Sequence, residues 1–128
     1  MNDHWLELWP PHDTTSDAHE SDAVCILAHY EKTNQITLRL VHQLYYLSAT
    51  SKVILVTQSR FTPSDVAFLE ENYCCAVIQL PKSQGIDHTS YKEGFHHLRN
   101  HMASAYSSAK WVWFVNDSVL GPFGSLDR

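Results

Sequence analysis

Trp111-Val-Trp-Phe-Val-Asn-Asp-Ser-Val-Leu-Gly-Pro122 is the stretch of the chain that decides its fold. It begins as a run of aromatic and β-branched residues and then changes abruptly to Asn116, Asp117 and Ser118. Such a run predicts a strand that is buried on both faces, as in a parallel sheet. The polar triplet would then follow the carboxyl end of that strand, where open α/β sheets place their ligand sites.

Three similar apolar runs lie earlier in the chain, at residues 23–28, 52–57 and 76–80. Helical patterns separate them. Apolar residues recur at helical spacing from Ile36 onward, and Thr62-Pro-Ser-Asp65 combines a capping-box pattern with proline at the first helical position. This alternation predicts an α/β fold, with a four-stranded, mainly parallel, Rossmann-like sheet and helices on both of its faces.

A second capping box, Ser90-Tyr-Lys-Glu93, predicts that the next helix begins near Ser90. Apolar residues then form a stripe at helical spacing, which fades near Tyr106. Gly94 falls inside this helix, where glycine costs about 1 kcal/mol relative to alanine. We therefore expect Gly94 to allow close packing, either on the sheet or on a ligand.

Length and composition limit the class of protein. With 128 residues the chain can form one domain with its own core. A net charge of −5 and the lack of a Lys/Arg run argue against nucleic acid as a partner. No apolar run is long enough to cross a bilayer, no signal peptide is recognisable, and three cysteines lack metal-site spacing. These features predict a cytoplasmic protein.

The first 22 residues show no sustained period, and we expect a flexible lead-in at 1–22 before an α/β domain at 23–128. Trp5 and Trp9 leave an alternative open, in which this segment docks on the domain or on a partner.

Polar residues follow all the predicted strands. Because the carboxyl ends of parallel strands meet at one edge of a sheet, these residues should converge there. They are His29-Tyr30, Gln58-Ser59-Arg60, the loop at 81–90 and Asn116-Asp117-Ser118. The chain has no Gly-x-Gly-x-x-Gly after its first strand and no Walker loop, which argues against a dinucleotide dehydrogenase and a P-loop NTPase.

A phosphate site is the chemistry that fits this edge. A helix that begins near Ser90 would offer free backbone N–H groups and a partial positive charge. Lys92 would lie in its first turn, and Gly85 would let the preceding loop approach a ligand. Across the edge, Asp117 is a candidate ligand for Mg²⁺ or Mn²⁺, and Tyr30 is a candidate for stacking on a base.

Each of these residues also has a purely structural interpretation. Asn116-Asp117-Ser118 is a good turn sequence, Lys92 is a candidate solvated charge, and His29 is a candidate core histidine. His97 and His101 have the spacing of a zinc pair, but no third ligand is evident, so a solvated helix face is favoured.

Three segments resemble the rhamnan synthesis protein F family, whose members are glycosyltransferase-like proteins of bacterial cell-surface rhamnan and lipopolysaccharide assembly with a GT-A type fold. The similarity covers about residues 23–125, and the Asn-Asp-Ser-Val-x-Gly-Pro string is its most specific part. The three segments are Val24-Cys-Ile-Leu-Ala-His-Tyr30, Gly85-Ile-Asp-His-Thr-Ser-Tyr-Lys-Glu-Gly94 and Phe114-Val-Asn-Asp-Ser-Val-Leu-Gly-Pro122.

The resemblance implies a nucleotide-sugar donor, with dTDP-rhamnose as a candidate, and inverting transfer of the sugar to a glycan acceptor. It implies a divalent metal at Asn116 and Asp117. It also implies a donor pocket, formed by His29, Tyr30, Ser59, Gly85, Asp87 and Lys92. One departure is His88-Thr89, which stands where the family usually has an apolar or aromatic residue and then glycine.

A GT-A enzyme builds its catalytic base from residues after the metal-type motif, whereas this sequence stops at Arg128, so we expect either a truncated product or a fragment of a longer gene. We therefore expect the donor-binding half of a transferase, which lacks turnover as an isolated chain and associates at most peripherally with a membrane. The alternative is a non-catalytic α/β interaction domain, which contacts a partner through its His-rich helix or its Trp5/Trp9 tail.

Overall fold

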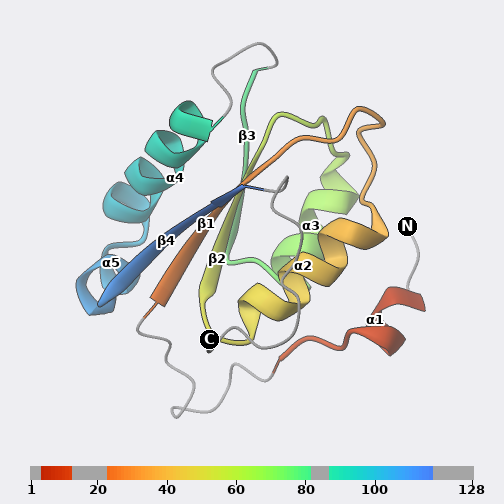
Figure 1. Ribbon diagram of the computed structural model, residues 1–128, viewed down its shortest axis with the longest axis horizontal. Coiled ribbons are helices and arrows are strands. Elements are labelled where there is room, and N and C mark those ends of the chain that lie inside the picture. Colours follow the sequence, from red (N-terminus) through yellow and green to blue (C-terminus); the bar gives the residue numbers. More distant parts are fainter. Residues whose placement is uncertain (1–3, 13–22, 82–86, 117–128) are drawn as a thin grey trace.

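The computed structural model describes residues 4–12, 23–81 and 87–116 (Figure 1). Strands and helices alternate along the chain from residue 23, as the hydrophobic patterns predict. In chain order the elements are α1 (His4–Leu8), β1 (Ala23–His29), α2 (Leu38–Ser48), β2 (Lys52–Thr57), α3 (Pro63–Asn72), β3 (Ala76–Gln79), α4 (Asp87–His101), α5 (Ala103–Ser108) and β4 (Trp111–Asn116).

The strands form a four-stranded sheet in the order β3-β2-β1-β4, and every neighbouring pair is parallel. The predicted α/β fold is therefore confirmed. The strand positions also agree with the apolar runs to within a residue, because strands of a parallel sheet are apolar over most of their length.

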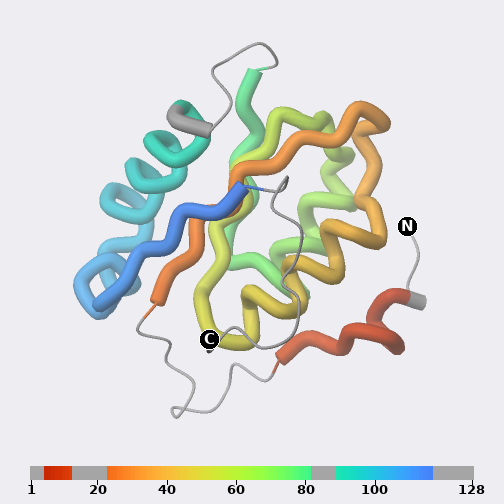
Figure 2. Tube along the Cα trace, viewed as in Figure 1, coloured from red at the N-terminus to blue at the C-terminus, as the bar shows by residue number. Residues whose placement is uncertain are grey.

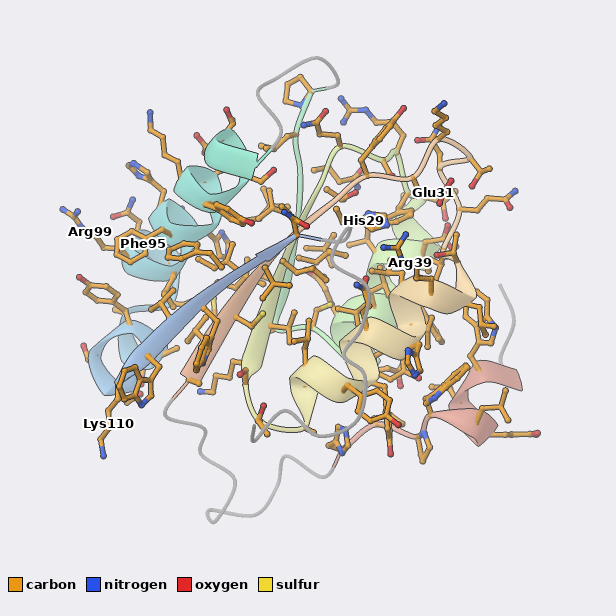
Figure 3. The ribbon with its side chains drawn as sticks, in the orientation of Figure 1. His29, Glu31, Arg39, Phe95, Arg99 and Lys110 are labelled. Atoms are coloured by element: carbon orange, nitrogen blue, oxygen red, sulfur yellow. The ribbon has the colours of Figure 1, made fainter. Side chains whose placement is uncertain are left out.

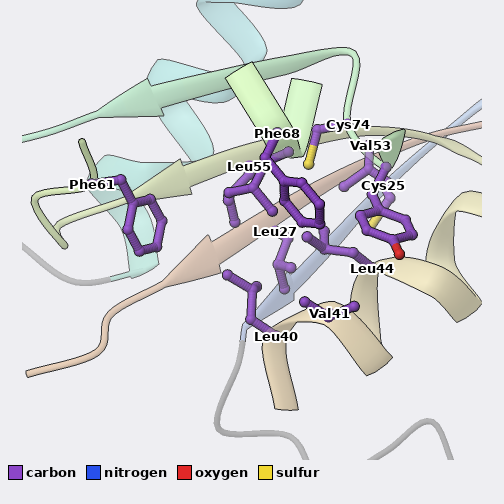
Figure 4. Packing of buried hydrophobic residues seen from close by; sticks show 12 residues of the cluster. Cys25, Leu27, Leu40, Val41, Leu44, Val53, Leu55, Phe61, Phe68 and Cys74 are labelled. Atoms are coloured by element: carbon purple, nitrogen blue, oxygen red, sulfur yellow. The ribbon is translucent and has the colours of Figure 1, made fainter. Parts of the chain in front are cut away.

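Helices cover both faces of the sheet, with α2 and α3 on one side and α4 and α5 on the other (Figures 1 and 2). The central strands alternate between two cores. In β1, Cys25 and Leu27 belong to the cluster with α2 and α3 (Figure 4), whereas Val24 and Ile26 belong to the cluster with α4 and α5. Successive side chains of a strand point to opposite faces, so β1 and β2 are buried on both.

The prediction that the stretch from Trp111 forms a strand buried on both faces is wrong. This stretch is β4, which lies at an edge of the sheet. Trp111 is 63% exposed, Trp113 is 55% exposed and Phe114 is 49% exposed. Aromatic and β-branched residues favour a strand, but the burial of that strand depends on its neighbours. Among the described residues, β4 has a neighbouring strand on one side alone.

Local chemistry explains the start of α3. The Thr62 hydroxyl accepts a hydrogen bond from the backbone N–H of Asp65, at 3.2 Å, and Pro63 is the first helical residue. The predicted helix start at this capping pattern is confirmed. Thr37 caps α2 in the same way, by accepting from the backbone N–H of Leu40 at 3.2 Å.

The prediction that the next helix begins near Ser90 is wrong, because α4 already begins at Asp87. Ser90 is 2% exposed, so it lies in the interior and does not serve as a helix cap. Lys92 consequently lies in the second turn of α4, where its side chain is exposed. The helix also ends earlier than predicted, since Met102 leaves the helical conformation between α4 and α5.

Gly94 is buried in α4 opposite Ile26 of β1 and Val56 of β2. The expectation of close packing on the sheet is therefore confirmed. The predicted apolar stripe of α4 is also confirmed, because Leu98 is fully buried and Phe95 packs against the same cluster.

Residues 4–12 pack against the α2–α3 side of the domain. The rings of Trp5 and Phe68 lie 6.4 Å apart, and the Tyr73 hydroxyl donates a hydrogen bond to the backbone carbonyl of Trp9. His12 stacks on Tyr45 and donates from Nε2 to its carbonyl oxygen, at 2.8 Å. In this part of the expected lead-in, the contacts match the docking alternative. The predicted boundary at residue 22 lies outside the described residues.

Candidate functional site at the carboxyl edge of the sheet

The order of the strands places a topological switch point between β1 and β4. From β1 the chain moves outward to β2 and β3, and it then returns to the other side of β1 to form β4. The helix that follows β1 lies on one face, and α4, which leads back towards β4, lies on the other (Figure 1). In open α/β sheets, ligands bind in the crevice at the carboxyl ends of two such strands.

Three of the predicted site residues flank this switch point. Ala28 of β1 is the register partner of Asn116 of β4, so His29 and Tyr30 emerge beside Asn116. Tyr30 and Asn116 are both half-buried, whereas His29 is buried. The structure thus brings together the ends of two strands that are far apart in the sequence.

His29 is fixed by the end of β2. Its Nδ1 lies 2.8 Å from Oγ1 of Thr57, and its ring lies 5.8 Å from the ring of Phe61 (Figure 3 labels His29). The Thr57 oxygen also accepts from the backbone N–H of Ser59, at 3.0 Å. The Thr57 hydroxyl therefore contacts both the His29 ring and the backbone that follows β2.

Ser59 ties two loops of this edge together. Its hydroxyl accepts from the backbone N–H of Glu31 at 2.7 Å and donates to the carbonyl oxygen of the same residue at 2.9 Å. Ser59 is fully buried. Because its hydroxyl hydrogen bonds to the Glu31 carbonyl oxygen, Ser59 has a structural role and holds the two loops of the site in place.

Two further hydrogen bonds strengthen this connection. The backbone N–H of Gln58 donates to the carbonyl oxygen of His29 at 3.1 Å, and that of Arg60 donates to Oδ1 of Asn34 at 2.8 Å. Asn34 has a φ of 56°, a left-handed conformation that asparagine tolerates better than most residues. The loops after β1 and β2 therefore form one connected unit.

The sequence did not reveal Thr57, Glu31 and Phe61 as parts of this unit. Thr57 ends an apolar run and looks like an ordinary strand residue. Glu31 contributes its backbone N–H and carbonyl groups, and a pattern of side chains in the sequence does not indicate backbone contacts. Asn34, in a polar turn sequence, was the one recognisable signal.

Four predicted site residues remain, namely Gly85, Asp87, Lys92 and Asp117. Gly85 and Asp117 lie outside the described residues, as does most of the loop before α4. Asp87 is the first residue of α4, the 15-residue helix that follows β3. The backbone N–H groups that lack a partner within this helix therefore belong to Asp87 and the residues directly after it. Lys92 is exposed one turn further on.

In the part of the chain that the structure describes, no group of three or more His, Cys, Asp or Glu side chains is placed to hold a metal ion. Asn116 offers one amide oxygen at the end of β4, and an oxygen ligand set for Mg²⁺ or Mn²⁺ would need Asp117 in addition. His97 and His101 lie 5.1 Å apart by ring centroid on α4, as the helical spacing predicts.

No protein-family model, no curated protein and no solved structure matches this chain. Nor do the described residues include a helix that is long and apolar enough to span a membrane.

Proposed function

We propose that this chain is a nucleotide-sugar-binding, glycosyltransferase-like domain of bacterial cell-surface polysaccharide assembly. One observation carries the proposal: the switch point between β1 and β4 has His29 and Tyr30 on one side and Asn116 on the other. A crevice at this place in a parallel sheet is where nucleotide ligands are expected. The sequence resemblance to the rhamnan synthesis protein F family points to the same ends of the same strands.

In this proposal the nucleoside lies against the loops after β1 and β2. Tyr30 offers a ring for stacking on the base, and the unit formed by His29, Thr57 and Ser59 provides a rigid wall. Rigidity favours binding because little conformational entropy is lost when the ligand arrives.

The diphosphate would lie between the start of α4 and the end of β4. The helix start provides N–H donors, and Asp87 and Lys92 are assigned to this side by the resemblance. Asn116 and Asp117 would hold Mg²⁺ or Mn²⁺, which neutralises the diphosphate charge. Because Lys92 lies in the second turn of α4, it would act through its long side chain.

Transfer to a glycan acceptor further requires a base that takes the proton of the acceptor hydroxyl. The residues of the proposed site are assigned to donor binding, with dTDP-rhamnose as the candidate donor. A cytoplasmic site of action, with peripheral contact to the membrane at which the glycan grows, completes the proposal.

Thermal unfolding with a panel of ligands tests this function. UDP, GDP and dTDP, each with Mg²⁺ or Mn²⁺, are added to the full chain. A ligand present at 100 times its dissociation constant adds about 2.7 kcal/mol to the free energy of unfolding. We expect one nucleoside diphosphate to stabilise the protein in a metal-dependent manner. No stabilisation by any member of the panel would contradict the proposal.

Two aspartate variants separate the metal site from general charge effects. Asp117→Ala should abolish the metal dependence of the stabilisation, because it removes the carboxylate ligand. Asp65→Ala, which removes a carboxylate in the first turn of α3, is the matched control and should retain that dependence. A metal dependence that survives in Asp117→Ala would place the metal elsewhere.

A second candidate, the non-catalytic interaction domain, is favoured by the exposed aromatic side chains of β4. The version of this candidate in which the N-terminal segment contacts a partner has less support, because Trp5 and Trp9 pack on the core of this domain. Deletion of residues 1–12 tests that version: it should destabilise the domain if the segment is part of the fold.

A further inference from the structure

Within the residues that the structure describes, the two edges of the sheet are protected to different degrees. At the β3 edge, the backbone N–H of Val77 donates to the Glu70 carboxylate of α3 at 3.1 Å, and the strand is four residues long. β4 has six residues, Trp-Val-Trp-Phe-Val-Asn, with no charge, no proline and no glycine. Natural sheets usually protect their edges with such features, and an unprotected edge is a template for pairing with another strand.

The helices that cover the sheet pack mainly over its central strands and less over β4. α4 packs chiefly over β1 and β2, and α2 packs chiefly over β2. By register, Trp111 and Trp113 share the face of Cys25, and Phe114 shares the face of Ile26, where its ring lies 5.1 Å from that of Tyr91. Large aromatic side chains are therefore exposed on both faces of the same strand.

We propose that the outer edge of β4 pairs antiparallel with β4 of a second copy of this chain, so that the four-stranded sheets of the two copies form one continuous sheet. A two-fold axis perpendicular to the sheet keeps each face on its own side. Residues opposite each other across the two strands must then point their side chains to the same face of the sheet. The two-fold axis therefore passes beside one residue of β4 and not between two residues.

The sequence of β4 fits an axis at Trp113. Trp113 then lies opposite its own copy, Trp111 lies opposite Val115, and Val112 lies opposite Phe114. Every one of these pairs is apolar, and aromatic and β-branched cross-strand pairs stabilise sheets. Lys110 lies opposite Asn116, so the pairing brings no like charges together. This self-complementarity is the reason to choose a second copy as the occupant.

The exposed area is consistent with an interface. If an aromatic side chain offers about 200 Å², the exposed fractions of 63%, 55% and 49% leave about 330 Å² per copy uncovered. Complete burial of these side chains in two copies would supply at most about half of the area of a small standard interface. The backbone ladder between the two strands adds to this core.

Sedimentation velocity of the full chain across the micromolar range tests the proposal. We expect a concentration-dependent dimer, and we expect Trp113→Lys to abolish it, because two ammonium groups would meet at the axis. Leu38→Lys is the matched control, since Leu38 is 53% exposed on α2, away from the edge, and this variant should still dimerise. A wild-type chain that stays monomeric, or a Trp113→Lys variant that dimerises as well as wild type, would overturn the proposal.

Disulfide formation tests the register in a Cys75→Ser background, because Cys75 is the exposed native thiol. Trp113→Cys should give a disulfide-linked dimer in air, since opposite residues of antiparallel strands have Cα atoms about 4.5–5.5 Å apart. In Trp111→Cys the two positions would be separated by about 14 Å along the strands, so this variant should stay unlinked. Equal linking of both variants, or linking of Trp111→Cys alone, would contradict an axis at Trp113.

Discussion

A Cβ atom built on Gly94 would lie 2.5 Å from Cγ2 of Ile26, closer than two such carbon atoms can approach. The same atom would lie 3.1 Å from Cγ2 of Val56. Gly94 therefore lets α4 pack closely on β1 and β2. This contact matters for the proposed site, because the beginning of α4 lies in the same rigid helix.

Gly94→Ala should lower the free energy of unfolding by about 1–2 kcal/mol. Overpacking in a core costs about 1–3 kcal/mol, and the better helix propensity of alanine returns up to about 1 kcal/mol. Urea unfolding followed by circular dichroism measures this difference.

Ile26→Ala provides the partner for a double-mutant cycle. It removes the Cγ2 atom that the new methyl group would meet, so Gly94→Ala should be neutral or stabilising in the Ile26→Ala background. An equal loss in both backgrounds would show that the contact between these two residues is not the cause.

Ser59→Ala should lower the free energy of unfolding by about 1–3 kcal/mol, because it leaves the backbone N–H and carbonyl of Glu31 without their partner. Ser107→Ala, an exposed serine of α5, is the control and should change stability by less than about 0.5 kcal/mol. Chemical denaturation of the two variants gives the comparison. Similar small effects would mean that Ser59 does not connect the two loops.

Tyr73→Phe should cost about 1 kcal/mol, since the Tyr73 hydroxyl donates to the carbonyl oxygen of Trp9 in the docked N-terminal segment. Tyr106→Phe is the matched control, because Tyr106 is 41% exposed on α5. Hydrogen exchange of residues 4–12 should increase in Tyr73→Phe alone. If exchange in this segment is unchanged, the contact does not hold it.

Stability should fall steeply above pH 9. Burial raises the pKa of Cys25 from 9.0 to about 12, and burial also raises the pKa of Cys74. Between about pH 9 and pH 12 both thiols ionise in the unfolded chain and stay protonated in the folded one. Each thiol then lowers the free energy of unfolding by about 1.4 kcal/mol per pH unit, whereas below pH 9 its contribution is fully present.

Urea unfolding between pH 8 and pH 10.5 measures this dependence. Cys25→Ala should reduce the slope by about 1.4 kcal/mol per pH unit. Val53→Ala, which truncates the register partner of Cys25, should lower stability at every pH without changing the slope. A slope that is the same in Cys25→Ala and wild type would assign the alkaline loss to other groups.

The elements that depend on local chemistry were predictable from the sequence. The apolar runs identified β1 and β2, and the Thr62 cap with Pro63 identified the start of α3, because each signal needs only residues within a few positions. The same reasoning marked Gly94 as a close contact, since an unexplained glycine in a helix needs a reason.

Features that depend on distant neighbours were not predictable. The composition of β4 favours a strand, but its exposure follows from its place at the end of the strand order. The bonds from His29 to Thr57 and from Ser59 to Glu31 each join residues 28 positions apart, so no spacing in the sequence indicates them. Ser90 and Glu93 form a capping pattern, which predicts that a helix can begin there. Packing decides where the helix does begin, and α4 begins three residues earlier, at Asp87.

The central claim is that a nucleoside diphosphate binds at the carboxyl ends of β1 and β4. Titration of the ¹⁵N-labelled chain with dTDP and Mg²⁺, followed by amide chemical shifts, tests it most directly. We predict shifts at residues 29–31, at residues 58–60 and at Asn116, while Ala103–Ser108 of α5, before the amino end of β4, should be unaffected. No shifts at saturating ligand, or shifts confined to α5, would contradict the claim.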